Sequence, residues 1–326
     1  MKAIIIKEYG DINQLIETEI PKPQALSGEV VVKIKAFGIN RAEIYMRQGA
    51  WGDVAKVSGI ECVGLIEHDP SDTYAKGQKV IALMGGMGRT INGSYAQYTC
   101  LPIQNVIAVS TSLNWQDLAA IPESYATAWS CLHENLNLKK NQTILIRGGT
   151  SSLALAAINI AANIDGVKVI ASTRDINNAE MLTLNGCDTV VIEDQNLNEQ
   201  IRQSYPDGID CVLDIVGNTT LLDSMKMVKK SGTVCNAGFL GGGEPFLFNP
   251  LMDMPPSVNL NFFASFLFGT KNFPLDTIPF HEIVSAVQNG IYRAKPVKTF
   301  AFSQIQQAHQ LMEQNQAKGK IVVVLE

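Results

Sequence analysis

The sequence predicts an α/β protein in which a doubly wound parallel sheet is inserted into a β-rich domain. Up to about residue 115, short apolar or alternating runs are separated by glycine and proline, which is typical of strands joined by turns. From about residue 116, strand-like runs alternate with helical patterns, and this rhythm indicates βαβ units around a parallel sheet. After Gly269 a mixed pattern returns, so we expect the middle segment to interrupt the first domain.

The first segment is expected to form a compact antiparallel barrel or sandwich. One short amphipathic helix, from about Arg41 to Gln48, interrupts its strands. The strand-like runs are VVVKIKAFGI at 30–39, GIECVGLIE at 59–67, QKVIALM at 78–84 and GSYAQYTC at 93–100.

The middle segment begins with QTILIRGG, a strand that ends in glycine, and the helical run SSLALAAINIAANI follows it. Its later strands, such as VKVIASTR and IDCVLDIVG, are almost entirely apolar, as expected for strands that are covered on both faces. The tail predicts a helix, a strand, a second helix and the closing strand GKIVVVLE. We therefore predict one domain from residues 1–117 and 266–326, and an inserted domain from residues 118–265.

Composition narrows the class of protein. The 326 residues include 26 Lys and Arg and 31 Asp and Glu, which gives a net charge of −5. This charge lacks the positive excess that attracts nucleic acid. No apolar run approaches the roughly 20 residues of a membrane span, and the N-terminal MKAIIIKEYGD lacks the long apolar region of a signal peptide. We expect a cytoplasmic protein that binds neither nucleic acid nor membrane.

The six cysteines lack the close spacing of metal sites and are expected to be buried thiols.

A candidate dinucleotide-binding loop lies between the first strand and the first helix of the middle segment. The backbone there must turn tightly and approach a pyrophosphate, and the helix N-terminus offers free N–H groups to it. The glycine-rich motif of such sites has small residues at three-residue intervals, and this chain has Gly148, Ser151 and Ala154 at that spacing. Two of the motif's glycines are therefore replaced by Ser and Ala. A simple strand-to-helix turn is the alternative. The predicted coenzyme-binding residues are Gly148, Gly149, Thr150, Ser151, Ser152 and Leu153.

The end of the second strand of this segment predicts the coenzyme. An NAD site usually has Asp or Glu there, whereas this chain has Ser172, Thr173 and Arg174. Two hydroxyls and a guanidinium suit a 2′-phosphate, so we predict NADPH rather than NADH. The alternative is that Arg174 is a surface residue, paired with Asp175.

Several segments together resemble the medium-chain dehydrogenase/reductase superfamily. IRGGTSSLALAAINIAA, VIASTR, LNGCDTVV, IDCVLDIVG and GTVCNAGFLG are similar to its coenzyme domain. KIKAFGINRAEIYMRQGAW, SGIECVGLIE, NGSYAQY and GKIVVVLE are similar to its chaperonin-10-like domain. The resemblance is greatest to the zinc-independent, zeta-crystallin-like quinone oxidoreductases. It implies a Rossmann-type sheet inserted into a GroES-like β-barrel, with an active site in the cleft between them.

The resemblance also implies that no metal ion is used. Zinc-dependent members of the superfamily place a cysteine where this chain has Asn40, a histidine where it has Ile60, and a second cysteine near Glu123. Isoleucine cannot bind a metal, and the remaining Asn and Glu would form a poor zinc site. We therefore predict no metal ligands.

The family chemistry is hydride transfer from a nicotinamide to an electron-poor alkene or a quinone, whose developing negative oxygen needs hydrogen-bond donors. The predicted polar wall is Asn40, Tyr45 and Arg47 on the helix from about Arg41, with Tyr125 as a second aromatic hydroxyl. Alternatives are that Tyr45 packs half-buried and that Asn40 also caps the helix.

The resemblance assigns further residues to the nicotinamide end of the coenzyme. Asn40 matches an asparagine near the nicotinamide ribose, and the other residues are Thr127, Gly238, Phe239, Phe263 and Ser265. For Phe263, packing in the sheet or in an interface is the alternative. Glu193 departs from the pattern, because some relatives have an aromatic or basic residue there, near the 2′-phosphate.

These observations predict an NADPH-dependent, zinc-free reductase of quinones or α,β-unsaturated carbonyls, with a small electrophile as its substrate. The apolar strand-like run NLNFFASFLF predicts a homodimer, since relatives pair this strand with its copy and an unpaired apolar edge would aggregate. The alternatives are an enoyl-thioester reductase and a non-catalytic NADPH-binding protein.

Overall fold

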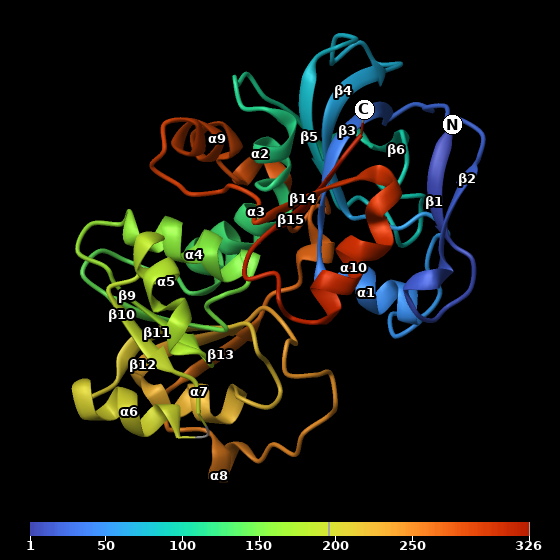
Figure 1. Ribbon diagram of the computed structural model, residues 1–326. Coiled ribbons are helices and arrows are strands. Elements are labelled where there is room, and N and C mark those ends of the chain that lie inside the picture. The colour runs from blue at the N-terminus through green and yellow to red at the C-terminus, as the bar shows by residue number, and fades with distance from the viewer. Residues whose placement is uncertain (195, 326) are drawn as a thin grey trace. The chain divides into compact units, whose positions relative to one another are not determined.

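The computed structural model describes residues 1–194 and 196–325 and divides into two compact units, Met1–Ala126 with Ser265–Glu326, and Thr127–Ala264 (Figure 1). Residues 118–126 therefore belong to the first unit, whereas the sequence prediction assigned them to the inserted domain. The reason is that α2 (Trp115–Ala119) packs on strands of the first unit, and α3 (Pro122–Ser130) continues from it across the boundary.

A seven-stranded sheet forms the core of the first unit. Its strand order is β14-β15-β3-β4-β5-β7, and β6 also pairs with β3. All of these pairs are antiparallel except β14 with β15. The bounds are β3 Glu29–Ile39, β4 Glu61–His68, β5 Lys79–Leu83, β6 Tyr98–Pro102, β7 Val106–Ala108, β14 Lys298–Ala301 and β15 Ile321–Val324.

The remaining elements of the first unit surround this sheet. Helix α1 spans Arg41–Gln48, which confirms the predicted helix, and it lies beside α10 (Ile305–Glu313) (Figure 1). A separate antiparallel pair is formed by β1 (Lys2–Ile6) and β2 (Leu15–Glu19), and α9 spans Phe280–Gln288. The 3-10 helices are η1 Ile12–Gln14, η2 Ile103–Asn105, η5 Ser265–Leu267, η6 Leu275–Thr277 and η7 Phe302–Gln304.

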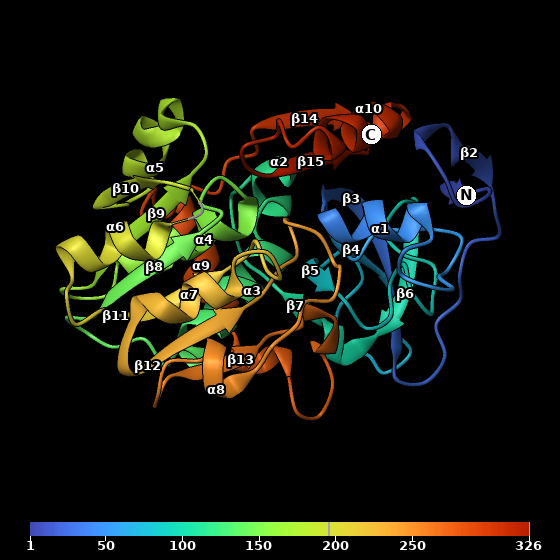
Figure 2. The same cartoon turned by 90° about the horizontal axis from the view of Figure 1, so that it is seen from below.

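The second unit is built on six parallel strands in the order β10-β9-β8-β11-β12-β13, which is 3-2-1-4-5-6 along the chain (Figure 2). This is the doubly wound, Rossmann-type order, and it confirms the predicted insertion of such a sheet into a β-rich domain. The bounds are β8 Thr143–Arg147, β9 Lys168–Thr173, β10 Thr189–Ile192, β11 Ile209–Asp214, β12 Val228–Asn236 and β13 Asn259–Phe262.

Helices cover the sheet because its central strands are apolar on both faces. Residues Ile144, Leu145 and Ile146 of β8 are completely buried, as are Val212 and Leu213 of β11. The helices are α4 Ser152–Ala162, α5 Ala179–Leu184, α6 Leu197–Ser204, α7 Leu221–Met227 and α8 Pro250–Asp253, with the π-helix η3 Cys131–Asn135 and the 3-10 helix η4 Ile176–Asn178. The strand order reverses at β8, which has β9 on one side and β11 on the other. Dinucleotides bind at the carboxyl ends of such strands.

Candidate functional site

The loop after β8 has the close backbone approach that a dinucleotide site requires. Gly148 adopts a φ of +85°, a conformation that favours glycine. The N–H of Gly149 donates to the carbonyl of Ser172 at 2.9 Å, and a Cβ on Gly149 would lie 2.8 Å from that oxygen. Neither position therefore tolerates a side chain without a shift of the loop.

Helix α4 begins directly after this loop. Ser151 is its N-cap, and the Ser151 hydroxyl accepts the N–H of Ala154 at 3.2 Å. The other N–H groups of the first turn lack intrahelical partners, and together with the helix dipole they attract an anion. Thr150, Ser152 and Leu153 complete the turn and are all partly exposed. The loop and the helix end thus fit the pyrophosphate of a nicotinamide coenzyme.

The predicted 2′-phosphate donors are engaged within the protein, with one exception. The Ser172 hydroxyl accepts the N–H of Gly148 at 3.2 Å and donates to Glu193 Oε2 at 2.6 Å. Thr173 is buried, and its hydroxyl forms hydrogen bonds with the backbone of Asp175. Arg174 is exposed, and Asp175 Oδ1 accepts the N–H of Asn177 as the cap of η4. Of the three predicted donors, Arg174 is the one exposed to solvent.

A buried guanidinium that the sequence prediction missed lies beneath this end of the sheet. Arg147, the last residue of β8, is 1% exposed. Its Nε and Nη2 donate to Glu193 Oε1 at 2.9 and 2.5 Å, and its Nη1 lies 2.8 Å from Asp223 Oδ2. Nη1 also donates to the Ser224 hydroxyl at 3.0 Å. An arginine at the end of an otherwise apolar strand is the sequence signal that indicates such a network.

The residues assigned to the nicotinamide end lie on different elements. Gly238 follows β12 beside β11, where a Cβ would lie 2.6 Å from the Ile215 carbonyl. Phe239 is 37% exposed, with its ring centroid 5.8 Å from that of Phe262. Phe263 is buried after β13. Two further residues flank the unit boundaries: Thr127 is buried in α3, and Ser265 begins η5 in the first unit.

A buried polar cluster occupies the first unit where Asn40 precedes α1. The Lys320 ammonium donates to Asn40 Oδ1 at 2.6 Å, to Glu61 Oε1 at 2.5 Å and to the Ser124 hydroxyl at 3.4 Å. Asn40 Nδ2 donates to Glu61 Oε1 at 2.8 Å and to Glu43 Oε1 at 3.3 Å. Both groups of the Asn40 amide are therefore held inside the cluster, and the N-cap position proposed for Asn40 is confirmed.

Glu43 is the second buried carboxyl of this cluster. It is completely buried and accepts the N–H of Asn40 at 2.5 Å and that of Ile60 at 3.2 Å. Burial, and secondarily the charge of Glu61, raise the pKa of Glu43 to about 8, although Lys320 opposes this shift. Glu43 is therefore protonated at neutral pH, and one ammonium balances the one remaining carboxylate. Within residues 1–194 and 196–325, no group of His, Cys, Asp and Glu side chains could hold a metal ion.

Two of the predicted polar-wall residues are buried instead. Arg47 is 0% exposed, and its guanidinium donates to the Gly10 carbonyl at 2.9 Å and pairs with Glu313 of α10. It therefore joins α1 to α10 rather than presenting donors to a ligand. Tyr125 is 2% exposed and stacks on Tyr292 with ring centroids 5.7 Å apart.

Tyr45 is the predicted hydroxyl that stays partly accessible. It lies half-buried on α1, and burial raises the pKa of its hydroxyl, which consequently keeps its proton at neutral pH. A protonated phenol is a hydrogen-bond donor, which is the type of group that a substrate oxygen gaining negative charge requires.

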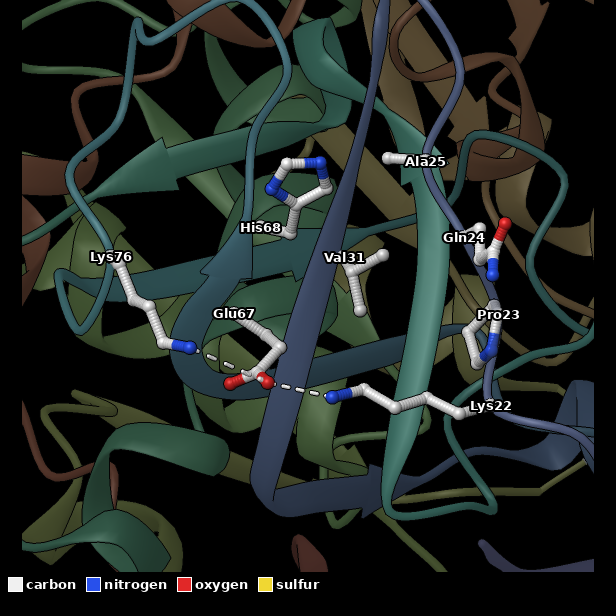
Figure 3. Close-up of a pocket in the computed structure, with 8 residues that line it drawn as sticks. All are labelled: Lys22, Pro23, Gln24, Ala25, Val31, Glu67, His68 and Lys76. Atoms are coloured by element: carbon white, nitrogen blue, oxygen red, sulfur yellow. Dashed lines mark hydrogen bonds and ion pairs between the residues drawn. The ribbon is translucent and has the colours of Figure 1, made fainter.

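A cavity of about 500 Å³ opens elsewhere on the first unit (Figure 3). Glu67 lies between two lysines, 2.6 Å from Lys22 Nζ and 3.7 Å from Lys76 Nζ (Figure 3). The hydrogen bond from Lys22 lowers the pKa of Glu67. Its lining shares no residue with the predicted site and consists of Lys22, Pro23, Gln24, Ala25, Val31, Glu67, His68 and Lys76.

Comparisons with known proteins agree with this architecture. A family model described as alcohol dehydrogenase GroES-like domain matches residues 26–111, and one described as zinc-binding dehydrogenase matches residues 185–323. The quinone oxidoreductase of Lama guanicoe is 25% identical over 338 residues, which cover 100% of this chain and 98% of the relative.

Two solved structures show the same fold. A mycobacterial protein described as complexed with NADPH superimposes with a TM-score of 0.86 at 22% identity, over 99% of this chain and 100% of the other. The CurK enoyl reductase superimposes with a TM-score of 0.84 at 19% identity, over 100% and 99%. Together the comparisons support an NAD(P)-dependent oxidoreductase. None of the helices that residues 1–194 and 196–325 form has both the length and the apolar character needed to cross a membrane.

Proposed function

Because the chain belongs to the medium-chain dehydrogenase/reductase superfamily, we propose that it reduces quinones or α,β-unsaturated carbonyls with NADPH and without a catalytic metal ion. The observation that supports zinc independence most directly is the Lys320 ammonium, which binds both Asn40 Oδ1 and Glu61 Oε1. The ammonium already binds the amide oxygen at the first of the three zinc-ligand positions and neutralises the buried carboxylate beside it. A divalent ion added there would be repelled by the ammonium.

The second unit is proposed to hold the coenzyme. The N–H groups at the start of α4 would bind the pyrophosphate, and the absence of side chains at Gly148 and Gly149 would let it approach the backbone. Arg174 would supply the charge opposite a 2′-phosphate. When bound, the coenzyme supplies a hydride from its nicotinamide ring.

The first unit is proposed to serve the substrate. Tyr45, whose hydroxyl stays protonated at neutral pH, would donate to the carbonyl oxygen that gains negative charge. The buried cluster around Asn40 would hold the start of α1 rigid, because Glu43 accepts the Asn40 N–H there. Substitution of Tyr45 by Phe is then expected to lower kcat by about tenfold to a hundredfold while NADPH binding stays unchanged.

The direct test is oxidation of NADPH with a panel of quinones, enones and a short enoyl thioester, measured with and without a strong zinc chelator. Turnover of a quinone or enone that the chelator leaves unchanged supports the proposal. A selective preference for the thioester would favour the enoyl-thioester reductase, and NADPH binding without any turnover would favour the non-catalytic alternative. Activity that is lost with the chelator and restored by zinc would show that the metal-free proposal is wrong.

We also propose a homodimer formed through β13. In the described sheet β13 pairs only with β12, and Phe262 on this edge strand is 55% exposed. Pairing with a second copy of the strand would cover this apolar edge. Light scattering of the purified chain is expected to give twice the monomer mass, and F262D is expected to shift the species toward the monomer. A wild-type monomer at micromolar concentration would refute the proposal.

A further inference from the structure

Glu193 lies where the coenzyme loop, β9 and β10 meet. Its N–H donates to the carbonyl of Thr173 at 2.8 Å, which places it directly beside the end of β9. The Ser172 hydroxyl donates to Glu193 Oε2 at 2.6 Å and accepts the N–H of Gly148 at 3.2 Å. A single hydroxyl therefore connects this carboxylate to the first residue of the loop.

The charge of Glu193 is only partly balanced. Arg147 is the guanidinium that pairs with it, and the same guanidinium lies 2.8 Å from Asp223 Oδ2. Two carboxylates sharing one guanidinium leave an excess of negative charge. Arg147 is 1% exposed, whereas the Glu193 side chain is 14% exposed, so the anionic partner is the one that a ligand meets.

This arrangement affects the two nicotinamide coenzymes differently. A 2′-phosphate needs hydrogen-bond donors and positive charge, but the Ser172 donor is already directed to Glu193, and the carboxylate repels the phosphate. A ribose 2′-hydroxyl can instead donate a hydrogen bond to a carboxylate, which is how acidic residues select NAD. Arg174 is exposed and lies two residues after Ser172. Its positive charge acts in the opposite direction, because it favours binding of the 2′-phosphate.

We propose that Glu193 is a specificity-determining residue that offsets Arg174, so that the chain binds NADH and NADPH with similar affinity. This inference rests on the proposed function, because it requires the coenzyme to occupy the loop after β8. Glu193 limits the preference for NADPH, and Arg147 positions the Glu193 carboxylate.

The test is calorimetric titration of the full chain with each coenzyme separately. E193Q keeps an amide oxygen as acceptor for Arg147, presents an NH2 group to the Ser172 hydroxyl and removes the charge. The NADPH Kd is therefore expected to fall by roughly fivefold to tenfold. The NADH Kd is expected to stay equal or to rise. D223N is the matched control, since it also removes a carboxylate from Arg147 but does not contact Ser172, and it is expected to leave the ratio of the two Kd values near that of the wild type.

A second variant keeps the assignment testable if E193Q does not fold. S172A is expected to leave the ratio of the NADPH and NADH Kd values unchanged, because the Ser172 hydroxyl already donates to Glu193. A selective loss of NADPH affinity in S172A would overturn the inference. An unchanged ratio in E193Q, or an equal shift in D223N, would also overturn it while leaving the proposed function intact. If the wild type binds neither coenzyme, the proposed function itself is wrong and the inference falls with it.

Discussion

Replacement of Glu43 by Gln tests the buried cluster through its protonation. Glu43 is completely buried beside Glu61 and accepts backbone N–H groups from Asn40 and Ile60. Burial and the neighbouring carboxylate raise its pKa from 4.5 to about 8, while Lys320 acts against the shift. Glutamine has nearly the same shape and cannot ionise, but its NH2 group cannot replace the Glu43 oxygen that accepts an N–H group. The change of the E43Q effect with pH, rather than its size at one pH, therefore isolates the charge.

The magnitude follows from linkage between protonation and folding. In the unfolded chain Glu43 loses its proton near pH 4.5, but in the folded chain it keeps the proton up to about pH 8. The folded state therefore binds more protons between these values, and the free energy of unfolding falls as the pH rises through this window. The difference between the two pKa values corresponds to a loss on the order of 5 kcal/mol at the alkaline end.

Urea denaturation of the full chain, wild type and E43Q, at about pH 5 and about pH 9 measures this effect. At the lower pH E43Q is expected to be less stable than the wild type by about 1–3 kcal/mol, because its buried NH2 group faces an N–H donor. At the higher pH E43Q is expected to be more stable by several kcal/mol, because only the wild type must bury a second carboxylate. E19Q, which changes an exposed glutamate on β2, is the control and should follow the wild type. A difference between E43Q and wild type that is constant with pH would refute this account of the cluster.

Two further predictions concern the buried ammonium and the coenzyme loop. K320M leaves Glu61 buried without its counter-charge. Urea denaturation is expected to show a free energy of unfolding that is lower by about 3–5 kcal/mol. A loss below about 1 kcal/mol would contradict the pairing. G149A places a Cβ 2.8 Å from the Ser172 carbonyl and is expected to raise the Kd for NADPH at least about tenfold by calorimetry. G243A, where a Cβ would meet no atom within 4 Å, is the matched control, and equal effects of the two variants would refute the role of the loop.

Features that depend on local pattern were predictable from the sequence. The apolar runs around Thr143–Arg147 and the small residues at 148–154 identify a strand, a tight turn and a helix without any distant partner. The capped helix Arg41–Gln48 is local in the same sense, because Glu43 accepts the N–H of Asn40 three residues earlier. Alternation of such units along the chain was enough to predict the doubly wound sheet.

Features that depend on distant partners were not predictable. Arg47 was expected to face a ligand, but its partner Glu313 is 266 residues away along the chain. Ser172 was expected to donate to a phosphate, but its hydroxyl donates a hydrogen bond to Glu193, which follows the neighbouring strand. No periodicity or spacing relates Asn40 to Lys320, which are 280 residues apart. In each case the polar side chain has a partner that only the tertiary structure brings to it.

The discontinuous first unit has a consequence for the order of events on the ribosome. Its residues Met1–Ala126 emerge early, whereas Ser265–Glu326 emerge only after the contiguous second unit has been synthesised. Strands β14 and β15 and Lys320 lie in that late segment, so until then the nascent first half lacks two strands of its sheet and the counter-ion of Glu61. Domains generally fold as units during synthesis, and the second unit can therefore form first. The part of the chain that is made first is accordingly the last to complete its sheet.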